Sequence, residues 1–152
     1  MPMPSDTDFM QQALALARKA NDRGEVPVGA VLVRGQIVIG EGANCSIHDH
    51  DPTAHAEIVA LRDAAKRVGD YRLNDSTLYV TLEPCIMCAS ALVHARVSRV
   101  VFGAWDLKAG GAGSIVDIFA IPALNHRVDV FGGVRAEECG SLLSEFFRAR
   151  RS

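Results

Sequence analysis

The stretch TLYVTLEPCIMCASALVHARVSRVVFGA, residues 77–104, decides the fold because it combines a strand, a helix and a second strand in a short span. Residues 77–83 and 98–104 are rich in the β-branched and apolar side chains of buried strands. Between them, the residues from Pro84 to about Arg96 follow a helical pattern. Two strands joined by one helix in this way are predicted to be parallel, with a right-handed crossover.

Two further strands precede this unit and one follows it. Residues 28–33 and 36–41 are β-rich runs separated by Arg34 and Gly35, which predicts an antiparallel hairpin. Residues 126–132 have the pattern of a fifth strand. Because helices are expected between and around these strands, the sequence predicts an α/β fold, a three-layer α/β/α sandwich around a mixed five-stranded sheet.

Apolar residues at helical spacing indicate three more helices. The first follows Ser5, which together with Asp8 resembles a capping box. The other two cover residues from about 55–68 and 136–150. The segment 108–125 has glycines in its first part and no readable pattern, so its structure is left open.

The composition is typical of one globular domain. The chain has 152 residues, of which 49% are hydrophobic and 22% charged, so one core is expected. The net charge of −2 gives no overall signal for nucleic acid, so such a partner needs a local basic patch. The chain begins with acidic residues where a signal peptide is basic, and no apolar run approaches the roughly 18 residues of a membrane span. We therefore expect a cytoplasmic protein with no membrane contact.

The pair Cys85-x-x-Cys88 indicates a metal site. In a reducing compartment such a pair holds metal or does redox work more often than it forms a structural disulfide. The two thiolates are one helical turn apart, so they can bind one metal ion from a single helix end. Zinc normally takes four ligands, and His55 at the start of another helix is a candidate for the third. The fourth position then stays open for water, as in catalytic zinc sites.

Glu57 is the candidate proton carrier beside this metal. His55 and Glu57 lie two residues apart at the first turn of a helix, where both side chains reach over the open helix end. Zinc with two thiolates and a neutral imidazole is formally uncharged, so it acidifies its water weakly and a base is needed. We expect Glu57 to take the proton from the zinc-bound water and to deliver it to the leaving side of a substrate.

Two other interpretations of these residues stay open. A Cys-x-x-Cys pair at a helix start can be a thioredoxin-like redox pair, although His55 and Glu57 then have no purpose. A closed structural zinc site requires a fourth protein ligand, and the candidates are Cys45, His48 and His50. Structural roles are expected for the other cysteines and histidines, namely Cys45, Cys139, His94 and His126.

Two motifs resemble a known family. His55-Ala56-Glu57 and Pro84-Cys85-Ile86-Met87-Cys88 match the H-x-E and P-C-x-x-C signature of the zinc-dependent cytidine and nucleobase deaminases. Four longer stretches resemble the bacterial tRNA-specific adenosine deaminases, and the similarity continues to the terminal FFRARR: EVPVGAVLV (25–33), DPTAHAEI (51–58), TLEPCIMCASAL (81–92) and RVVFGAWDLKAGGAGS (99–114). The resemblance implies a cytidine deaminase-like fold, one zinc ion per chain and a homodimer. It also implies that adenosine in the anticodon stem-loop of a tRNA, at the wobble position, is converted to inosine.

The resemblance also implies roles for individual residues. It makes His55, Cys85 and Cys88 the zinc ligands and Glu57 the proton shuttle. Asn44 matches an asparagine that hydrogen-bonds the flipped nucleoside, although it is also typical of a turn after a strand. Ala56 and Phe147 are also expected to contact the substrate. Asp106 and Lys108 are expected beside the flanking nucleotides, and Arg148, Arg150 and Arg151 at the phosphates.

Trp105, next to this loop, is not expected in every relative, so its effect on the RNA context is open. The stretch IMCASALVHA (86–95) is more apolar than one sheet face requires, which also favours a partner chain. Both features concern the surroundings of the site rather than the reacting groups.

The implied reaction is hydrolytic. Glu57 deprotonates zinc-bound water, hydroxide attacks C6 of an adenine swung out of the anticodon loop, and Glu57 protonates N1 and then the departing amine. The alternative enzyme is a deaminase of a free base or nucleoside, such as cytosine, guanine or cytidine, on the same fold. A third hypothesis is an RNA-binding relative without activity that uses zinc structurally. Residue types and spacing alone lead only to a zinc hydrolase that acts on an amidine-like group.

Overall fold

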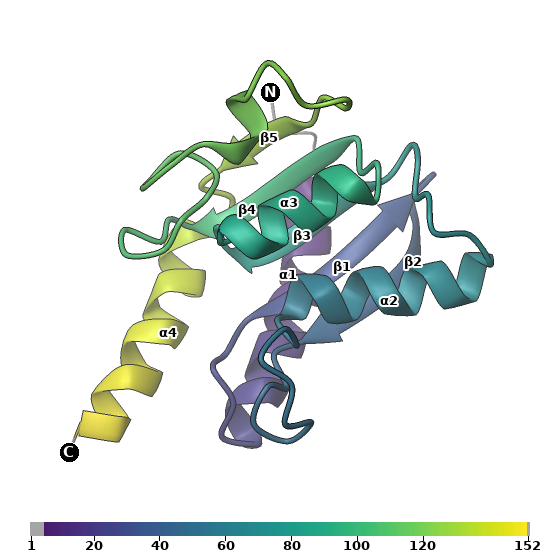
Figure 1. The fold of residues 1–152 in the computed structure, drawn as a ribbon. Coiled ribbons are helices and arrows are strands. Elements are labelled where there is room, and N and C mark those ends of the chain that lie inside the picture. The colour runs from purple at the N-terminus through teal and green to yellow at the C-terminus, as the bar shows by residue number, and fades with distance from the viewer. Residues whose placement is uncertain (1–4, 152) are drawn as a thin grey trace.

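A mixed sheet of five strands organises residues 5–151, the part of the chain that the computed structural model describes (Figure 1). The strands lie in the order β2-β1-β3-β4-β5. Their bounds are β1 (Gly29–Arg34), β2 (Ile37–Ala43), β3 (Thr77–Leu82), β4 (Arg99–Ala104) and β5 (Asp129–Gly132). The helices are α1 (Asp6–Asp22), α2 (Ala56–Val68), α3 (Ile86–His94) and α4 (Ala136–Arg151), with a short 3₁₀ helix η1 (Ile118–Ala120).

The strand directions confirm the mixed sheet. β1 pairs with both β2 and β3 in antiparallel fashion, whereas β3–β4 and β4–β5 are parallel. The crossover β3-α3-β4 is therefore the parallel unit that residues 77–104 predict. The hairpin between β1 and β2 turns one residue later than expected, at Gly35 and Gln36. Both of these residues have positive φ, as the tight turns that suit twisted hairpins require.

Alternate residues of the strands face two cores, one on each side of the sheet, rather than the one core expected from the composition, and this gives the three layers. Leu78 and Val80 of β3 join the core that includes residues of α2 and α3. Tyr79, between them, joins the core that includes residues of α1 and α4. The same alternation in β1 and β4 leaves both faces of the central strands buried, as in sheets covered by helices on both sides. The predicted α/β/α arrangement is confirmed.

The capping of α1 and the starts of α2 and α3 differ from the predictions. The Ser5 side chain makes no capping hydrogen bond, so the capping box is wrong; the first-turn Asp6 instead accepts hydrogen bonds from Tyr79 (2.7 Å) and Arg99 (2.9 Å) on the sheet. α2 begins one residue after His55. α3 begins at Ile86 rather than Pro84, because the backbone of Cys85 is extended and forms a β-bridge with Gly110.

α2 approaches the sheet closely over two glycines of β2. A Cβ atom at Gly42 would lie 2.4 Å from the carbonyl oxygen of Ala56 and 2.5 Å from the amide nitrogen of Ala60. A Cβ atom at Gly40 would lie 2.6 Å from the next turn of α2. Any larger residue at these positions would push the helix off the sheet, so the glycines set how closely the helix approaches the sheet. None of the helices within residues 5–151 is long and apolar enough to cross a membrane.

Candidate active site and metal centre

The N-termini of α2 and α3 meet beside the end of β3, and each is preceded by a residue that can bind a metal. His55 lies directly before α2 and Cys85 directly before α3, both with extended backbone. The Nδ1 atom of His55 is 3.6 Å from Sγ of Cys85 and 3.5 Å from Sγ of Cys88. The structure therefore brings together three residues that the sequence separates by up to 33 positions.

The spacing of these atoms fits a zinc ion. Ligands at about 2.0–2.3 Å from a tetrahedral ion lie about 3.3–3.8 Å from one another, and two sulfurs with an imidazole nitrogen form a donor set that zinc prefers. Within residues 5–151, one group of side chains is placed to hold a metal ion, and it consists of His55, Cys85 and Cys88. All of their ligand atoms lie within 4.8 Å of one another. Cys45, His48 and His50 do not join it, so this described part of the chain supplies three ligands rather than four.

The two thiols of the site differ in protonation. A hydrogen bond from Cys88 lowers the pKa of Cys85 to about 4, and the same contact raises the pKa of Cys88. His55 also donates to Cys85, which raises the pKa of the imidazole. One thiol is therefore a thiolate at neutral pH, and the thiolate is the form that binds metal.

Glu57 lies in the first turn of α2 and is 4% exposed. Burial, together with the negative charge of Cys85, raises the pKa of its carboxyl to about 7. A carboxyl with a pKa near 7 can both accept and release a proton at neutral pH, which is what a general acid–base catalyst requires. The surroundings of Glu57 thus match the chemistry expected of it from the sequence.

A cavity of about 650 Å³ opens above these residues and is large enough for a nucleobase. His55, Glu57 and Cys85 line it at the helix starts. The loop after β4 and the helix α4 contribute much of the rest. The residues of these two elements at the cavity are Trp105, Asp106, Leu107, Lys108, Ala109, Gly140, Leu143, Ser144 and Phe147.

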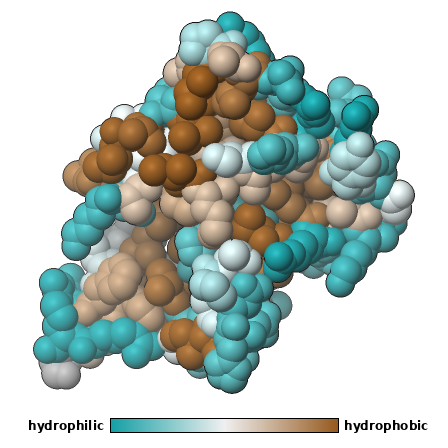
Figure 2. Space-filling model, in the orientation of Figure 1, coloured by the Kyte–Doolittle hydropathy of each residue, from teal (hydrophilic) through white to brown (hydrophobic). Residues whose placement is uncertain are grey.

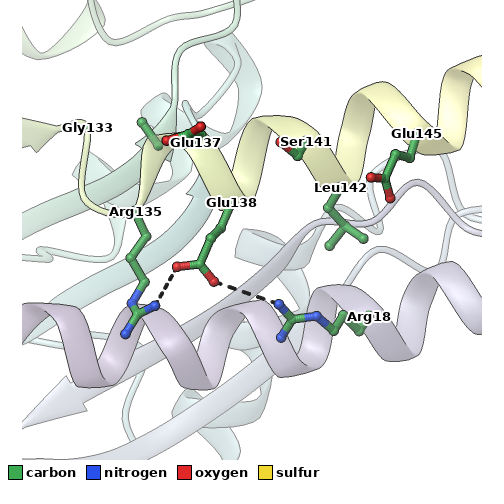
Figure 3. Close-up of a pocket in the computed structure, with 9 residues that line it drawn as sticks. Arg18, Gly133, Arg135, Glu137, Glu138, Ser141, Leu142 and Glu145 are labelled. Atoms are coloured by element: carbon green, nitrogen blue, oxygen red, sulfur yellow. Dashed lines mark hydrogen bonds and ion pairs between the residues drawn. The ribbon is translucent and has the colours of Figure 1, made fainter.

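A second hollow, of about 730 Å³, lies between α1 and α4, and neither Glu57 nor the three metal-binding residues line it (Figure 3). Figure 3 shows Glu138 between Arg135 and Arg18. Its carboxylate oxygens lie 2.5 Å from Arg135 and 3.9 Å from Arg18. Arg135 also donates to Gln11 and to the carbonyl of Thr7, so the start of α4 is attached to α1. Because both of its arginines are paired with Glu138, we regard this hollow as a helix contact and the cavity at Glu57 as the candidate active site.

Comparisons with known proteins identify the family. The profile of the MafB19-like deaminases matches residues 4–151. A Haemophilus influenzae protein named tRNA-specific adenosine deaminase is 56% identical over 147 residues, which cover 96% of this chain and 85% of that protein. The chain belongs to the family of the tRNA-specific adenosine deaminases. The family resemblance of the sequence motifs is confirmed.

Solved structures of related deaminases have the same fold. One, from a study of A-to-I editing by tRNA:A34 deaminases at the wobble position of tRNA, has a TM-score of 0.87 and 45% identity, covering 90% of this chain and 99% of that one. The guanine deaminase of Bacillus subtilis has a TM-score of 0.64 and 35% identity, covering 95% of this chain and 93% of that one. The deaminase-like fold is confirmed, and within it the chain is more similar to the tRNA deaminase.

The residues predicted to contact substrate fall into two groups. Asn44, Asp106, Lys108 and Phe147 line the cavity. The Asn44 Oδ1 atom accepts the N–H of Ala56 at 2.7 Å, which fixes the side chain at the start of α2. Ala56 itself is fully buried, and its N–H is occupied by this bond. The carboxylate of Asp106 accepts the amide of Lys108 at 3.0 Å and so shapes its own loop.

The C-terminal arginines form the second group. Arg148, Arg150 and Arg151 lie in the last turn of α4, are exposed and do not line the cavity. Arg150 donates to the carbonyl of Gly24 at 2.7 Å, and its guanidinium lies 4.2 Å from the ring centroid of Phe146. This arginine therefore holds the far end of α4 against the body of the molecule. The expected phosphate contacts stay predictions.

The expected structural roles of other residues agree with their contacts. Cys139 of α4 is buried in the core between this helix and the sheet, and Cys45 is buried with its thiol 3.1 Å from a carboxylate oxygen of Asp49. The His126 ring lies 2.7 Å from the carbonyl oxygen of Val97. His94, in the last turn of α3, lines a small hollow away from the site.

Glu83 is a residue of the site that the sequence patterns did not reveal. It is buried, and its carboxylate accepts the amides of Asp106, Ala112 and Ser114, each at 3.0 Å, together with the Ser114 hydroxyl. Burial alone raises the pKa of this carboxyl, but the hydrogen bonds from Ser114 and the amides lower it below its usual value. Glu83 thus holds the substrate loop, residues 105–114, against the start of α3.

We predict that Glu83→Gln loosens the substrate loop. The new NH₂ group faces backbone N–H donors, so at least one hydrogen bond to a charged acceptor is lost, at about 1.5–3 kcal/mol. Amide hydrogen exchange in residues 105–114 is expected to accelerate by about ten- to 150-fold, since 1.4 kcal/mol is a factor of ten. Glu145→Gln, at an exposed site on α4, is the control. Unchanged exchange in Glu83→Gln would show that the carboxylate does not hold the loop.

Proposed function

We propose that this chain hydrolyses adenosine to inosine at the wobble position of a tRNA anticodon. The observation that carries the proposal is the buried Glu57 beside the His55–Cys85–Cys88 cluster, at the base of a nucleobase-sized cavity. The chain's relatives supply the substrate, because a protein 56% identical to it is named tRNA-specific adenosine deaminase. A cytoplasmic location, where tRNA is modified, stays a prediction.

We propose that the metal is zinc, with one ion per chain held by His55, Cys85 and Cys88. The donor types and the 3.5–3.6 Å spacing of the ligand atoms support this choice. When bound, zinc supplies a Lewis acid that makes water nucleophilic at neutral pH. The two helix N-termini, each equivalent to roughly half a positive charge, stabilise the thiolates and any negative charge that develops beside them.

Glu57 moves the protons of the reaction. Its carboxylate takes a proton from the attacking water, whose oxygen bonds to C6 of adenine, and passes protons to N1 and to the exocyclic amine. The C6–N bond then breaks, so adenosine and water yield inosine and ammonia. Because Glu57 is buried and its pKa is raised to about 7, both transfers are feasible near neutral pH.

The other lining residues position the base. Oδ1 of Asn44 is held by the Ala56 N–H, which leaves the amide NH₂ group to donate to the nucleoside. A base in an anticodon loop costs less to unstack than one in a duplex, which suits a cavity that takes the whole base. Asp106, Lys108 and Phe147 lie at the same cavity and are proposed to contact the nucleotides around the target. The exposed C-terminal arginines are proposed to contact phosphates.

We propose that the chain acts as a homodimer. Four apolar side chains, each 41–53% exposed, form what we call the apolar patch: Ile86, Ile115, Val116 and Ile121. Figure 2 shows apolar side chains gathered on the face that carries α3 and the segment that contains η1. Contiguous apolar surface of this kind usually meets a partner, and a self-complementary patch favours a two-fold dimer.

We predict that purified chain, incubated with total tRNA, produces A-to-G changes in sequencing reads at one anticodon position. The Glu57→Gln variant keeps the size of the side chain and one acceptor but cannot carry a proton. Its deamination rate is expected to fall by on the order of 10² to 10⁴ or more, with zinc content, melting temperature and stem-loop affinity retained.

Other outcomes of this experiment would reject parts of the proposal. Near-normal inosine formation by Glu57→Gln would refute the proton-transfer role. Ammonia released from free guanine, cytosine or cytidine, without inosine in tRNA, would indicate a deaminase of small substrates. If zinc-loaded protein forms neither inosine nor ammonia, the chain is an inactive RNA-binding relative.

We predict that the chain sediments as a dimer at micromolar concentration and that Ile115→Lys shifts it towards monomer. The substitution places a charge in the apolar patch, where burial of an unpaired ammonium group is costly. Ile37→Lys, at an isoleucine that is 67% exposed on the opposite edge strand, is the matched control and is expected to remain dimeric. Sedimentation of the unmodified chain as a monomer would rule out the dimer.

A further inference from the structure

Trp105 is an exposed aromatic residue at the mouth of the cavity. It follows β4 directly and lines the same cavity as Glu57 and Cys85, yet 53% of its surface is exposed. It is also the only tryptophan of the chain. An indole exposed at a binding cavity is costly to leave in water, and such rings commonly serve as contact surfaces.

The Trp105 ring is held in place from one side. Its centroid lies 5.8 Å from that of the buried Phe102 in an edge-to-face arrangement, with an interplanar angle of 89°. Gly133 lies directly against it, since a Cβ atom there would be 2.7 Å from Cη2 of the indole. The ring is therefore preorganised by the backbone between β5 and α4, while the rest of its surface is free to contact a ligand.

A second exposed aromatic ring lines the same cavity from another element. Phe147 of α4 is 47% exposed and packs edge-to-face against Phe146, with ring centroids 5.4 Å apart. Lys108, three residues after Trp105, also lines the cavity. Aromatic faces next to a cation form the surface that single-stranded nucleic acids prefer, because bases stack on the rings while phosphates lie near the charge.

We propose that Trp105 is a specificity-determining residue whose indole stacks on a nucleobase that flanks the target adenosine. The inference rests on the proposed function, because only a polynucleotide substrate has a flanking base. A purely structural role would place the same ring over Phe102 and Gly133 but would give it no effect on substrate binding. Stacking on one aromatic ring is worth about 5- to 150-fold in affinity, corresponding to roughly 1–3 kcal/mol per base.

The fluorescence of the single tryptophan tests the contact directly. The Glu57→Gln variant is expected to bind an anticodon stem-loop with little turnover, and all tryptophan emission comes from position 105. Stacking of a base on the indole is expected to quench this emission on titration with the stem-loop. The quenching is expected to disappear when the flanking nucleotide on one side of the target adenosine is abasic. Equal quenching by the intact stem-loop and by both abasic stem-loops would overturn the proposal.

Kinetics test the consequence for specificity. Trp105→Ala is expected to lower kcat/KM for the stem-loop by about 5- to 150-fold, mainly through KM, whereas Trp105→Phe retains most of it. Tyr71→Ala, which removes an aromatic ring that is 72% exposed outside the cavity, is the control and is expected to match the unmodified chain. If the alanine variant melts early, Trp105→Phe and the fluorescence titration still decide.

The outcomes separate this inference from the proposed function. If the unmodified chain forms inosine and Trp105→Ala has the same kcat/KM, the stacking role fails and the function stands. If the unmodified chain forms no inosine in any tRNA, the function fails and the stacking role fails with it. If Trp105→Ala lowers kcat/KM equally for the intact and both abasic stem-loops, the ring is structural and the proposal is rejected.

Discussion

The meeting of two helix N-termini beside the end of β3 is the constraint on which the rest of the structure depends. The parallel crossover places Cys85 where β3 ends, and the glycines of β2 let α2 lie close enough to bring His55 within 3.6 Å of it. Each helix start also presents free N–H groups and a partial positive charge. This positive charge offsets the repulsion between the thiolates, the buried carboxylate and an electron-rich base, so all three can lie close together.

Three buried glutamates show how the surroundings of a carboxyl determine its role. Burial raises the pKa of Glu57 to about 7, so it can carry protons. Burial acts to raise the pKa of Glu83 and Glu25 as well, but hydrogen bonds outweigh it. Hydrogen bonds from Ser114 and neighbouring amides lower the pKa of Glu83. Hydrogen bonds from the His48 backbone and ring lower the pKa of Glu25. Glu25 stays charged and holds the loop at residues 47–48, and Glu83 stays charged and holds the substrate loop, whereas Glu57 lines the cavity.

Much of the fold and of the metal site is predictable because it is local in the sequence. Strand-helix-strand patterns and the motifs around His55 and Cys85 depend on residues that are near neighbours in the chain. The role of Glu83 is not predictable in this way, since its partners lie 23 to 31 residues later in a segment without periodicity. The Ser5 capping box is wrong for the same reason: Tyr79 and Arg99 on the sheet, rather than a local cap, partner the first turn of α1.

X-ray absorption at the zinc edge most directly tests the metal centre on which the proposed reaction depends. A site held by His55, Cys85 and Cys88 predicts about one zinc ion per chain, with two sulfur neighbours near 2.3 Å and two nitrogen or oxygen neighbours near 2.0 Å. One sulfur neighbour is expected to be lost in Cys88→Ala. Three or four sulfur neighbours in the unmodified chain would indicate a closed structural site, and absence of zinc would contradict the mechanism.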